Sequence, residues 1–169
     1  MDNLDSEALA ERYINRMYID HPAVRWWAHP RILVGGSINN SDDFENMQNK
    51  FGVTSVISVE SEHSDSGKVP EAILCHLPTP DDGSAPSVQH WKTLIDFAQV
   101  ALKDPSSKVY VHCQMGGSRS PAAAYAILRT VFNFSPQDAL SSIQRFKTEY
   151  GGHWYHQNYI GSVETALTS

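Results

Sequence analysis

A cysteine and an arginine separated by five residues stand in the second half of the chain, within the stretch VYVHCQMGGSRSP from Val109 to Pro121. This spacing lets the segment from Cys113 to Arg119 wrap a tetrahedral oxyanion, with the thiol beneath the central atom and the guanidinium beside the equatorial oxygens. A planar guanidinium binds two phosphate oxygens at once, which an ammonium group does less well. The pattern therefore indicates chemistry on phosphate esters.

The residues around this stretch predict a strand before the cysteine and a helix from the arginine onward. Lys108 to His112 is rich in valine and tyrosine, and the sequence after Arg119 (RSPAAAYAILRTVF) is rich in alanine. Loop N–H groups and the positive end of such a helix bind anions and favour the thiolate form of Cys113. A thiolate there would be a nucleophile that needs no separate base.

The other loop residues have expected supporting roles. Gly116 would supply a positive φ angle or a close backbone approach. Ser120 would donate a hydrogen bond to the Cys113 sulfur and ease its departure from a phosphocysteine, while His112 is expected to brace the loop rather than react. The predicted phosphate-binding residues are Gln114, Met115, Gly116, Gly117, Ser118 and Arg119.

The segment HCQMGGSRS resembles the signature loop of the cysteine-dependent protein tyrosine phosphatase superfamily, His-Cys-x2-Gly-x2-Arg-Ser. The serine before its arginine is similar to that of the dual-specificity phosphatases. The segments ILVGGSINN, FGVTSVISV, LPTPDD and FNFSPQDALSSIQRFK follow the order of that family, so the resemblance covers residues 30 to 168. The resemblance implies a phosphatase that needs no cofactor.

The resemblance also implies a general acid, an aspartate on a movable loop that precedes the cysteine. Asp81 has the family's spacing and follows Pro80 as the family pattern prefers, whereas its neighbour Asp82 is the alternative. The family often has an asparagine that braces the signature loop, and Asn158 falls at this position. The residue before it is Gln157 instead of the usual proline.

The other cysteine and two of the histidines each have a structural interpretation as well as a functional one. Cys75 is expected to be a core thiol, and the alternative is a protective disulfide with Cys113 under oxidation. His153 and His156 have a spacing that suits a metal. Since no carboxylate or cysteine cluster accompanies them, surface or packing roles are favoured and no metal site is predicted.

Composition is typical of a compact enzyme with one core. The chain has 169 residues, of which 41% are hydrophobic, and a net charge of −6. The acidic balance disfavours nucleic acid and acidic membranes as partners, and no run approaches the length of a membrane span. Only two cysteines are present, which favours a reducing compartment over a disulfide scaffold. We expect a cytoplasmic monomer.

The alternation of strands and helices predicts a three-layer α/β/α fold with a central, mainly parallel sheet, similar to protein tyrosine phosphatases. Residues 1–29 are expected to form a helical extension packed on the core, with its helix at Glu7 to Tyr18, and residues 30–169 the catalytic domain. Other predicted elements are a helix begun by Ser41 and ended by Gly52, a strand at Val53 to Val59, helices at Val88 to Leu102 and from Arg119, and a helix begun by Ser135 and Pro136.

These features predict a phosphomonoester hydrolase that works through a phosphocysteine, with a phosphorylated protein as its substrate. The loop sequence QMGGS contains no basic residue, which ranks phosphoproteins above phosphoinositides and other non-protein monoesters. A non-catalytic phosphate-binding protein is a further alternative. Sulfur transfer of the rhodanese kind is disfavoured, because its loop usually holds four residues before the arginine.

Overall fold

The computed structural model describes residues 25–114, 116–150 and 157–169, with only the backbone described for 145–150. One five-stranded sheet has the strand order β1-β2-β5-β3-β4. β1 pairs with β2 in antiparallel fashion, and the β2–β5, β5–β3 and β3–β4 pairs are all parallel. The strands are β1 (Arg25–His29), β2 (Ile32–Gly35), β3 (Ser55–Ser58), β4 (Leu74–His76) and β5 (Val109–His112).

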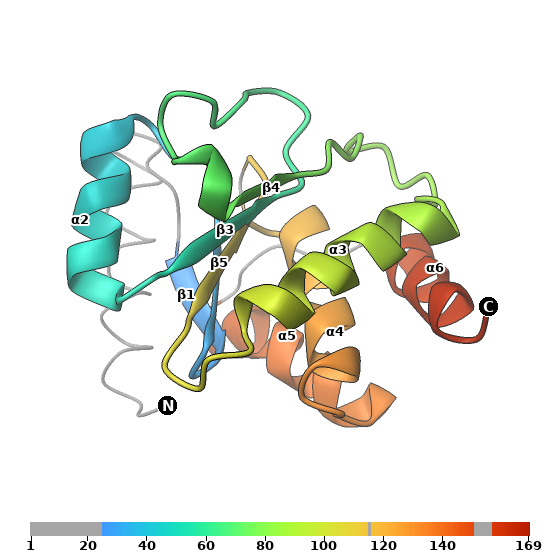
Figure 1. The fold of residues 1–169 in the computed structure, drawn as a ribbon. Helices are drawn as coiled ribbons and strands as arrows, with labels where there is room; N and C mark the ends of the chain where they lie inside the picture. Colours follow the sequence, from blue (N-terminus) through green and yellow to red (C-terminus); the bar gives the residue numbers. More distant parts are fainter. Residues whose placement is uncertain (1–24, 115, 151–156) are drawn as a thin grey trace.

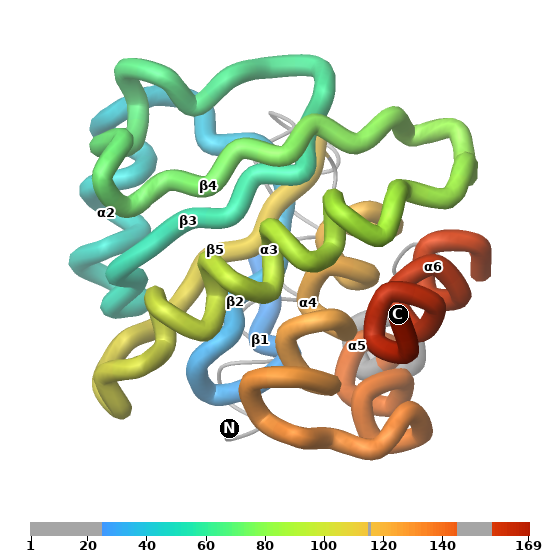
Figure 2. The backbone as a smooth tube through the Cα atoms, turned by 45° about the vertical axis from the view of Figure 1, so that its right-hand side comes forward, coloured from blue at the N-terminus to red at the C-terminus, as the bar shows by residue number. Residues whose placement is uncertain are grey.

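The helices cover both faces of this sheet. α2 lies on one side, and α3 to α6 gather on the other side, where α4 contacts β2 and β5 (Figures 1 and 2). This arrangement confirms the predicted three-layer α/β/α fold with a mainly parallel sheet. The helices are α2 (Ser41–Phe51), α3 (Val88–Ala101), α4 (Arg119–Thr130), α5 (Pro136–Tyr150) and α6 (Gln157–Leu167), with a 3-10 turn η1 at Glu71–Ile73.

Local capping explains where the helices begin and end. The Asn40 side chain accepts a hydrogen bond from the N–H of Asp43 at 2.8 Å, so the cap of α2 is one residue earlier than the predicted Ser41. Gly52 ends α2 with a φ of 73°, as predicted, because glycine adopts this left-handed conformation without steric cost. The predicted cap of α5 is confirmed, since Ser135 Oγ accepts from the N–H of Asp138 at 3.1 Å.

The strand β5 and the helix α4 form the centre of the molecule. All four β5 residues are buried, and ten of the twelve α4 residues are buried as well, including four alanines that allow close packing. Because β5 is the middle strand of a parallel arrangement, its carboxyl end opens at the edge where α/β sheets bind ligands. The loop that carries Cys113 begins at this end.

The sheet begins earlier in the chain than the predicted domain boundary. Residues 25–29 form the edge strand β1 rather than part of a helical extension, and Trp26 and Trp27 are buried in the core. A boundary between residues 29 and 30 would therefore cut the β1–β2 hairpin. The helix predicted at Glu7 to Tyr18 lies outside the described residues.

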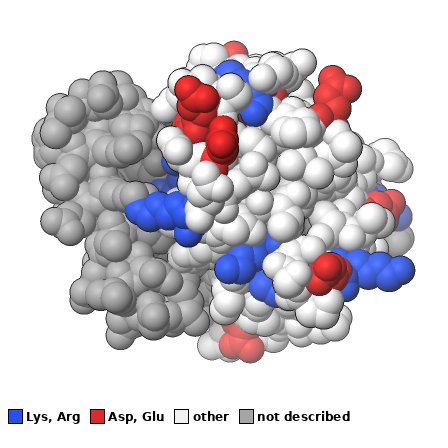
Figure 3. All heavy atoms as spheres, turned by 60° about the vertical axis from the view of Figure 1, so that its left-hand side comes forward, with Lys and Arg blue, Asp and Glu red and all other residues white. Residues whose placement is uncertain are grey.

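The face in Figure 3 carries small groups of acidic and basic side chains, some of them adjacent, with large uncharged areas between the groups. No helix within the described ranges is long and apolar enough to cross a membrane.

Candidate active site

The loop between β5 and α4, residues 113–118, surrounds a buried sulfur atom. Cys113 is only 2% exposed, and its Sγ accepts a hydrogen bond from the N–H of Gly116 at 3.3 Å. Ser120 Oγ lies 3.2 Å from the same sulfur, in the first turn of α4. The structure therefore brings Cys113, Gly116 and Ser120 together in the way that the sequence predicted. We call residues 113–120 the cradle.

Gly116 is required for two independent reasons. Its φ is +81°, a conformation that side chains with a Cβ rarely adopt. A Cβ at this position would also lie 2.7 Å from the carbonyl carbon of Gly35 in β2. The cradle is held against the same segment by hydrogen bonds from Cys113 N–H to Gly35 O, at 3.2 Å, and from Ser37 N–H to Gln114 O, at 3.0 Å.

Arg119 is the buried cation of the site, with 2% exposure. Its Nη1 and Nη2 donate to the two carboxylate oxygens of Glu62, the second at 2.7 Å, and Nη1 also donates to Thr79 O at 2.9 Å. The hydrogen bond from Arg119 holds the pKa of Glu62 below its ordinary value. Nε is buried, makes no hydrogen bond to any described residue, and lies 3.7 Å from Asp81 Oδ1.

The loop of residues 77–87, which we call the Asp81 loop, places its two aspartates differently. Asp81 is half exposed and its carboxylate faces Arg119. Asp82 Oδ1 instead accepts from the N–H and hydroxyl of Ser84 at 2.9 and 2.6 Å, within the loop itself. This geometry supports the choice of Asp81 over Asp82 as the acidic group of the site.

His112, the last residue of β5, is fully buried between two carboxylates. Nε2 is hydrogen bonded to Asp65 Oδ2, and Nδ1 lies 3.2 Å from Cys113 O and 3.4 Å from Glu60 Oε2. Burial disfavours the imidazolium, but the hydrogen bonds with Asp65 and Glu60 outweigh it and raise the pKa of His112 to about 9. A charged His112 ring with a carboxylate on each side supports the prediction that this residue braces the loop.

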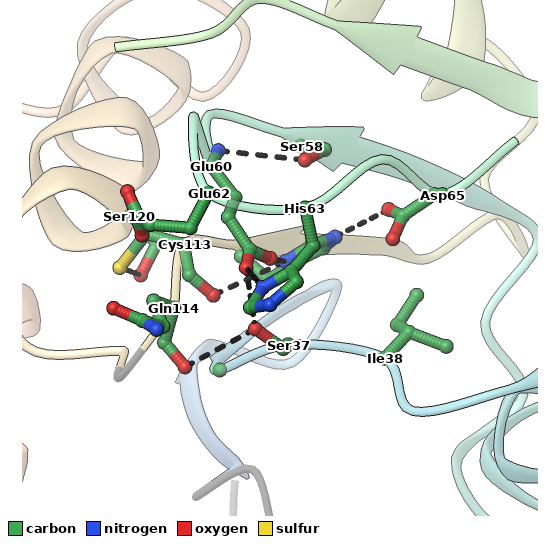
Figure 4. Close-up of polar contacts among 12 residues, drawn as sticks. Ser37, Ile38, Ser58, Glu60, Glu62, His63, Asp65, Cys113, Gln114 and Ser120 are labelled. Atoms are coloured by element: carbon green, nitrogen blue, oxygen red, sulfur yellow. Dashed lines mark hydrogen bonds and ion pairs between the residues drawn. The ribbon is translucent and has the colours of Figure 1, made fainter. Parts of the chain in front are cut away.

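Glu60 links this histidine to the segment after β2. Its buried carboxylate accepts from Ser37 Oγ at 2.7 Å and lies 2.6 Å from His63 Nδ1 (Figure 4). Burial alone would raise its pKa, but hydrogen bonds with His112, Ser37 and His63 lower the pKa of Glu60 to about 2. The carboxylate therefore remains charged over the neutral range.

The loop of residues 59–69, which we call the Glu62 loop, supplies the carboxylates that sequence reasoning missed. That reasoning described residues 61–69 only as a polar surface loop near the site. Glu60 and Asp65 are nevertheless at most 1% exposed. A usable signal was present, because acidic residues directly follow the buried strand β3 at the carboxyl edge of a parallel sheet.

The remaining predicted site residues differ in their positions. Gln114 is exposed and Gly117 is buried. Ser118 stands at the N-cap position of α4, where its side chain makes no capping hydrogen bond. Asn158 donates to Gly83 O at 3.0 Å, so its observed contact is with the Asp81 loop instead of the predicted contact with the signature loop. Met115, His153 and His156 lie outside the described residues. Within the described part of the chain, no cluster of three potential metal ligands occurs.

Cys75 is a core thiol on β4. It pairs with Ile57 of β3, which pairs in turn with Val111 of β5, so two strand spacings separate Cys75 from the level of Val111. Two spacings amount to about 10 Å, beyond the ~7 Å limit between the Cα atoms of a disulfide. Cys113 stands two positions beyond Val111 in the chain. Burial also raises the pKa of the Cys75 thiol to about 11. A disulfide between the two cysteines would need backbone movement.

Sequence comparison relates this site to a known catalytic domain. The family model described as "Dual specificity phosphatase, catalytic domain" matches residues 36–160. Dual specificity protein phosphatase 22 of Xenopus laevis is 30% identical over 123 residues, which cover 70% of this chain and 56% of that protein. Dual specificity protein phosphatase 26 of Rattus norvegicus is 34% identical over 55 residues, 32% of this chain and 26% of that protein. The chain thus spans about half or less of these relatives.

Solved structures share the fold at lower sequence identity. The crystal structure of PTPMT1 in complex with PI(5)P superposes with a TM-score of 0.69 at 19% identity, covering 85% of this chain and 94% of that one. The human tyrosine phosphatase-like serine/threonine/tyrosine-interacting protein gives a TM-score of 0.67 at 18% identity, covering 85% and 95%. These similarities extend over nearly the whole described fold.

Proposed function

Because the chain belongs to the dual specificity phosphatase catalytic domain family, we propose that it hydrolyses phosphate monoesters on proteins through a phosphocysteine intermediate. One observation carries the proposal. The buried Cys113 sulfur accepts a hydrogen bond from the Gly116 N–H and lies beside Ser120. Arg119, at the end of the same cradle, has its Nε 3.7 Å from the Asp81 carboxylate and without a hydrogen bond to any described residue. A nucleophile, an oxyanion-binding cation and an acid therefore belong to one site.

In the first step, the Cys113 thiolate attacks phosphorus and the bond to the ester oxygen breaks. The electron pair of that bond goes to the leaving oxygen, which takes a proton from Asp81. Arg119 and the backbone amides of Gln114 to Arg119 stabilise the charge on the three equatorial oxygens. The buried Arg119 Nε would then gain the hydrogen-bond partner that it lacks among the described residues.

In the second step, water hydrolyses the phosphocysteine. The Asp81 carboxylate takes a proton from the water, the water oxygen bonds to phosphorus, and the phosphorus–sulfur bond breaks. The thiolate of Cys113 leaves with the electron pair and is stabilised by a hydrogen bond from Ser120 Oγ, which lies 3.2 Å from the sulfur. Atoms and charge balance with no added cofactor, and inorganic phosphate is released.

The charges around the cradle favour a protein substrate. The cradle sequence QMGGS has no basic side chain. The loops that face Arg119 contribute Glu62 and Asp81, and Glu62 already neutralises the guanidinium. A single phosphate on a peptide fits this surrounding better than an inositol carrying several phosphates, because each additional phosphate would face carboxylates. PTPMT1, which shares the fold, has been crystallised with PI(5)P, so lipid phosphates are the alternative to test.

We also propose that the protein acts as a monomer in a reducing compartment such as the cytoplasm. Cys113, Arg119 and Asp81 all come from one chain, so the site needs no second copy to be complete. Cys75 and Cys113 are both free thiols, and a free catalytic thiolate persists where thiols stay reduced.

The first experiment compares p-nitrophenyl phosphate hydrolysis by the native chain, Cys113→Ser and Cys75→Ser, with a reducing agent and a metal chelator present. We expect turnover that falls by at least about 10³-fold in Cys113→Ser, since the nucleophile is lost. Cys75→Ser is the matched control and should stay within about 2-fold, because removing a core thiol leaves the cradle unchanged. Activity retained by Cys113→Ser would contradict the proposal, and an inactive native chain would favour phosphate binding without catalysis.

A second experiment ranks substrates by kcat/KM. Phosphotyrosine and phosphothreonine peptides are compared with vesicles that contain a phosphoinositide. We expect the better peptide to exceed the lipid by about 10-fold or more, through differences in binding of the groups around the phosphate. A higher value for the lipid would overturn the protein assignment while leaving the phosphocysteine mechanism intact.

A further inference from the structure

The hydroxyl of Tyr159 connects the two ends of the turn that carries Asp81. It donates to Pro80 O at 2.7 Å and accepts from the N–H of Gly83 at 3.1 Å. The neighbouring Asn158 donates to Gly83 O at 3.0 Å. These three hydrogen bonds reach across more than seventy positions of sequence and enclose Asp81 and Asp82 between them.

The helix that supplies these groups is itself tied to the rest of the site. Ser162 of α6 accepts from Trp91 Nε1 of α3 at 2.7 Å. Glu164 of α6 binds Arg129 of α4 at 2.7 Å and also accepts from the hydroxyl of Tyr125. In Figure 1, α6 lies beside the start of α3, where the Asp81 loop ends. Since α4 begins at Arg119, the acid-bearing turn and the guanidinium are held relative to one common framework.

We propose that Tyr159, assisted by Asn158, is a positioning residue that holds Asp81 at the distance from the cradle needed for proton transfer. This inference rests on the proposed function, in which Asp81 is the general acid. Tyr159 does not touch the reacting atoms, and it acts only through the backbone of the Asp81 loop. Neither residue's contact with this loop was predicted from the sequence.

The two ends of these contacts differ in burial. The Tyr159 side chain is fully buried, whereas Asp81 is 52% exposed, so little packing holds the aspartate itself. Gly83 has a φ of 76° and adds backbone freedom at the end of the turn. Without the hydroxyl, Pro80 C=O and Gly83 N–H would lose a shared partner. Asp81 would then sample positions from which proton transfer is poor, and displacements near 1 Å are costly.

The leaving group separates a positioning effect from general destabilisation. p-Nitrophenolate departs without needing a proton, whereas phenolate depends strongly on the acid. For Tyr159→Phe we compare kcat/KM, which reports formation of the phosphocysteine and not its hydrolysis. We expect kcat/KM to fall by about 10-fold with phenyl phosphate and by less than about 2-fold with p-nitrophenyl phosphate. In an Asp81→Asn background, Tyr159→Phe should produce no further loss of activity, because both changes remove the same contribution, proton donation by Asp81.

Tyr125→Phe is the matched control. It removes a hydroxyl from another buried tyrosine whose partner, Glu164, also lies on α6. Glu164 keeps its ion pair with Arg129 in this variant, so α6 stays tied to α4. We expect similar small losses with both substrates. A leaving-group effect equal to that of Tyr159→Phe would overturn the proposal, as would additivity of Tyr159→Phe with Asp81→Asn.

Amide hydrogen exchange provides a measurement that does not depend on activity. Tyr159→Phe should speed exchange in residues 80–87 by about 10-fold, since the Gly83 N–H loses its acceptor, and Tyr125→Phe should not. Unchanged exchange in this segment would contradict the proposal even if the chain were inactive. Fast exchange with normal leaving-group dependence would show that the contacts hold the loop but do not position an acid, and would also overturn it.

Discussion

The candidate active site is built from two kinds of segment, the cradle on one side and the Glu62 and Asp81 loops on the other. The cradle, residues 113–120, is one uninterrupted segment whose groups converge on the Cys113 sulfur across at most seven positions. Arg119 instead meets Glu62 and Thr79 across 57 and 40 positions. The nucleophile is thus built by local backbone geometry, whereas the surroundings of the cation are built by the order of the strands.

The two regions also differ in burial. Cys113 and Arg119 are each 2% exposed, but the side chains of Glu62 and Asp81 are 28% and 52% exposed. A substitution in the cradle has no solvent or neighbouring group that can compensate for it, so we expect a near-complete loss of activity. Changes in the loops should produce graded losses, because water and the backbone can adjust there.

The largest effect is expected for Arg119→Lys. An ammonium group keeps the charge but loses the planar fork and its bidentate geometry, so kcat/KM should fall by about 10³-fold. Arg31→Lys is the control, because the Arg31 guanidinium donates to backbone carbonyls near the opposite end of β5. It should change kcat/KM by less than about 3-fold. A mild loss in Arg119→Lys would mean that charge alone suffices and would weaken the distinction between cradle and loops.

The next effect concerns stability, at the junction where β5 meets the Glu62 loop. The pKa of His112 is about 9, above its ordinary value of 6.5, so its contribution to folding is complete below pH 6.5. That contribution is lost as pH rises through 9, and it amounts to on the order of 3 kcal/mol.

Urea unfolding at several pH values between 6 and 9.5 tests this prediction. The native chain should lose stability across this window, and His112→Gln should show a flatter dependence because it cannot titrate. Parallel curves for the two proteins would show that the histidine does not carry a buried charge.

A smaller effect is expected for Asp81→Asn, in the exposed loop. The variant should lose about 10²-fold in kcat with phenyl phosphate, because proton donation to the leaving oxygen is removed. Asp82→Asn is the matched neighbour and should lose less than about 3-fold, since Asp82 binds Ser84 within its own loop. The reverse ranking of the two variants would reassign the acid to Asp82.

The smallest effect is expected for Glu62→Gln. One amide oxygen still accepts from Arg119, but the second acceptor and the charge are lost, so the guanidinium is held less firmly. We expect kcat/KM to fall by about 10-fold. Glu71→Gln, an exposed carboxylate at the 3-10 turn, should leave it unchanged. A loss as large as that of Arg119→Lys would show that the Glu62 loop belongs functionally with the cradle.

Predictability from the sequence followed this division between local and long-range contacts. The strand before Cys113, the helix from Arg119 and the cap at Ser135 depend on residues only a few positions apart, and all were found. The mainly parallel three-layer fold followed from the alternation of such elements. The strand Arg25–His29 was not predicted, because it is defined by pairing with β2 rather than by its own pattern.

By itself, the sequence determined the contiguous part of the site. Ser120 lies beside the Cys113 sulfur, Gly116 forms the tight turn, and Arg119 begins a helix. Only the tertiary structure decided that Glu62 holds Arg119, that Glu60 and Asp65 enclose His112, and that Tyr159 ties down the Asp81 loop. The physical reason is that a tight loop is governed by the φ and ψ angles of neighbouring residues. Contacts across tens of positions exist only because the parallel strands β3, β4 and β5 deliver their loops to one edge of the sheet.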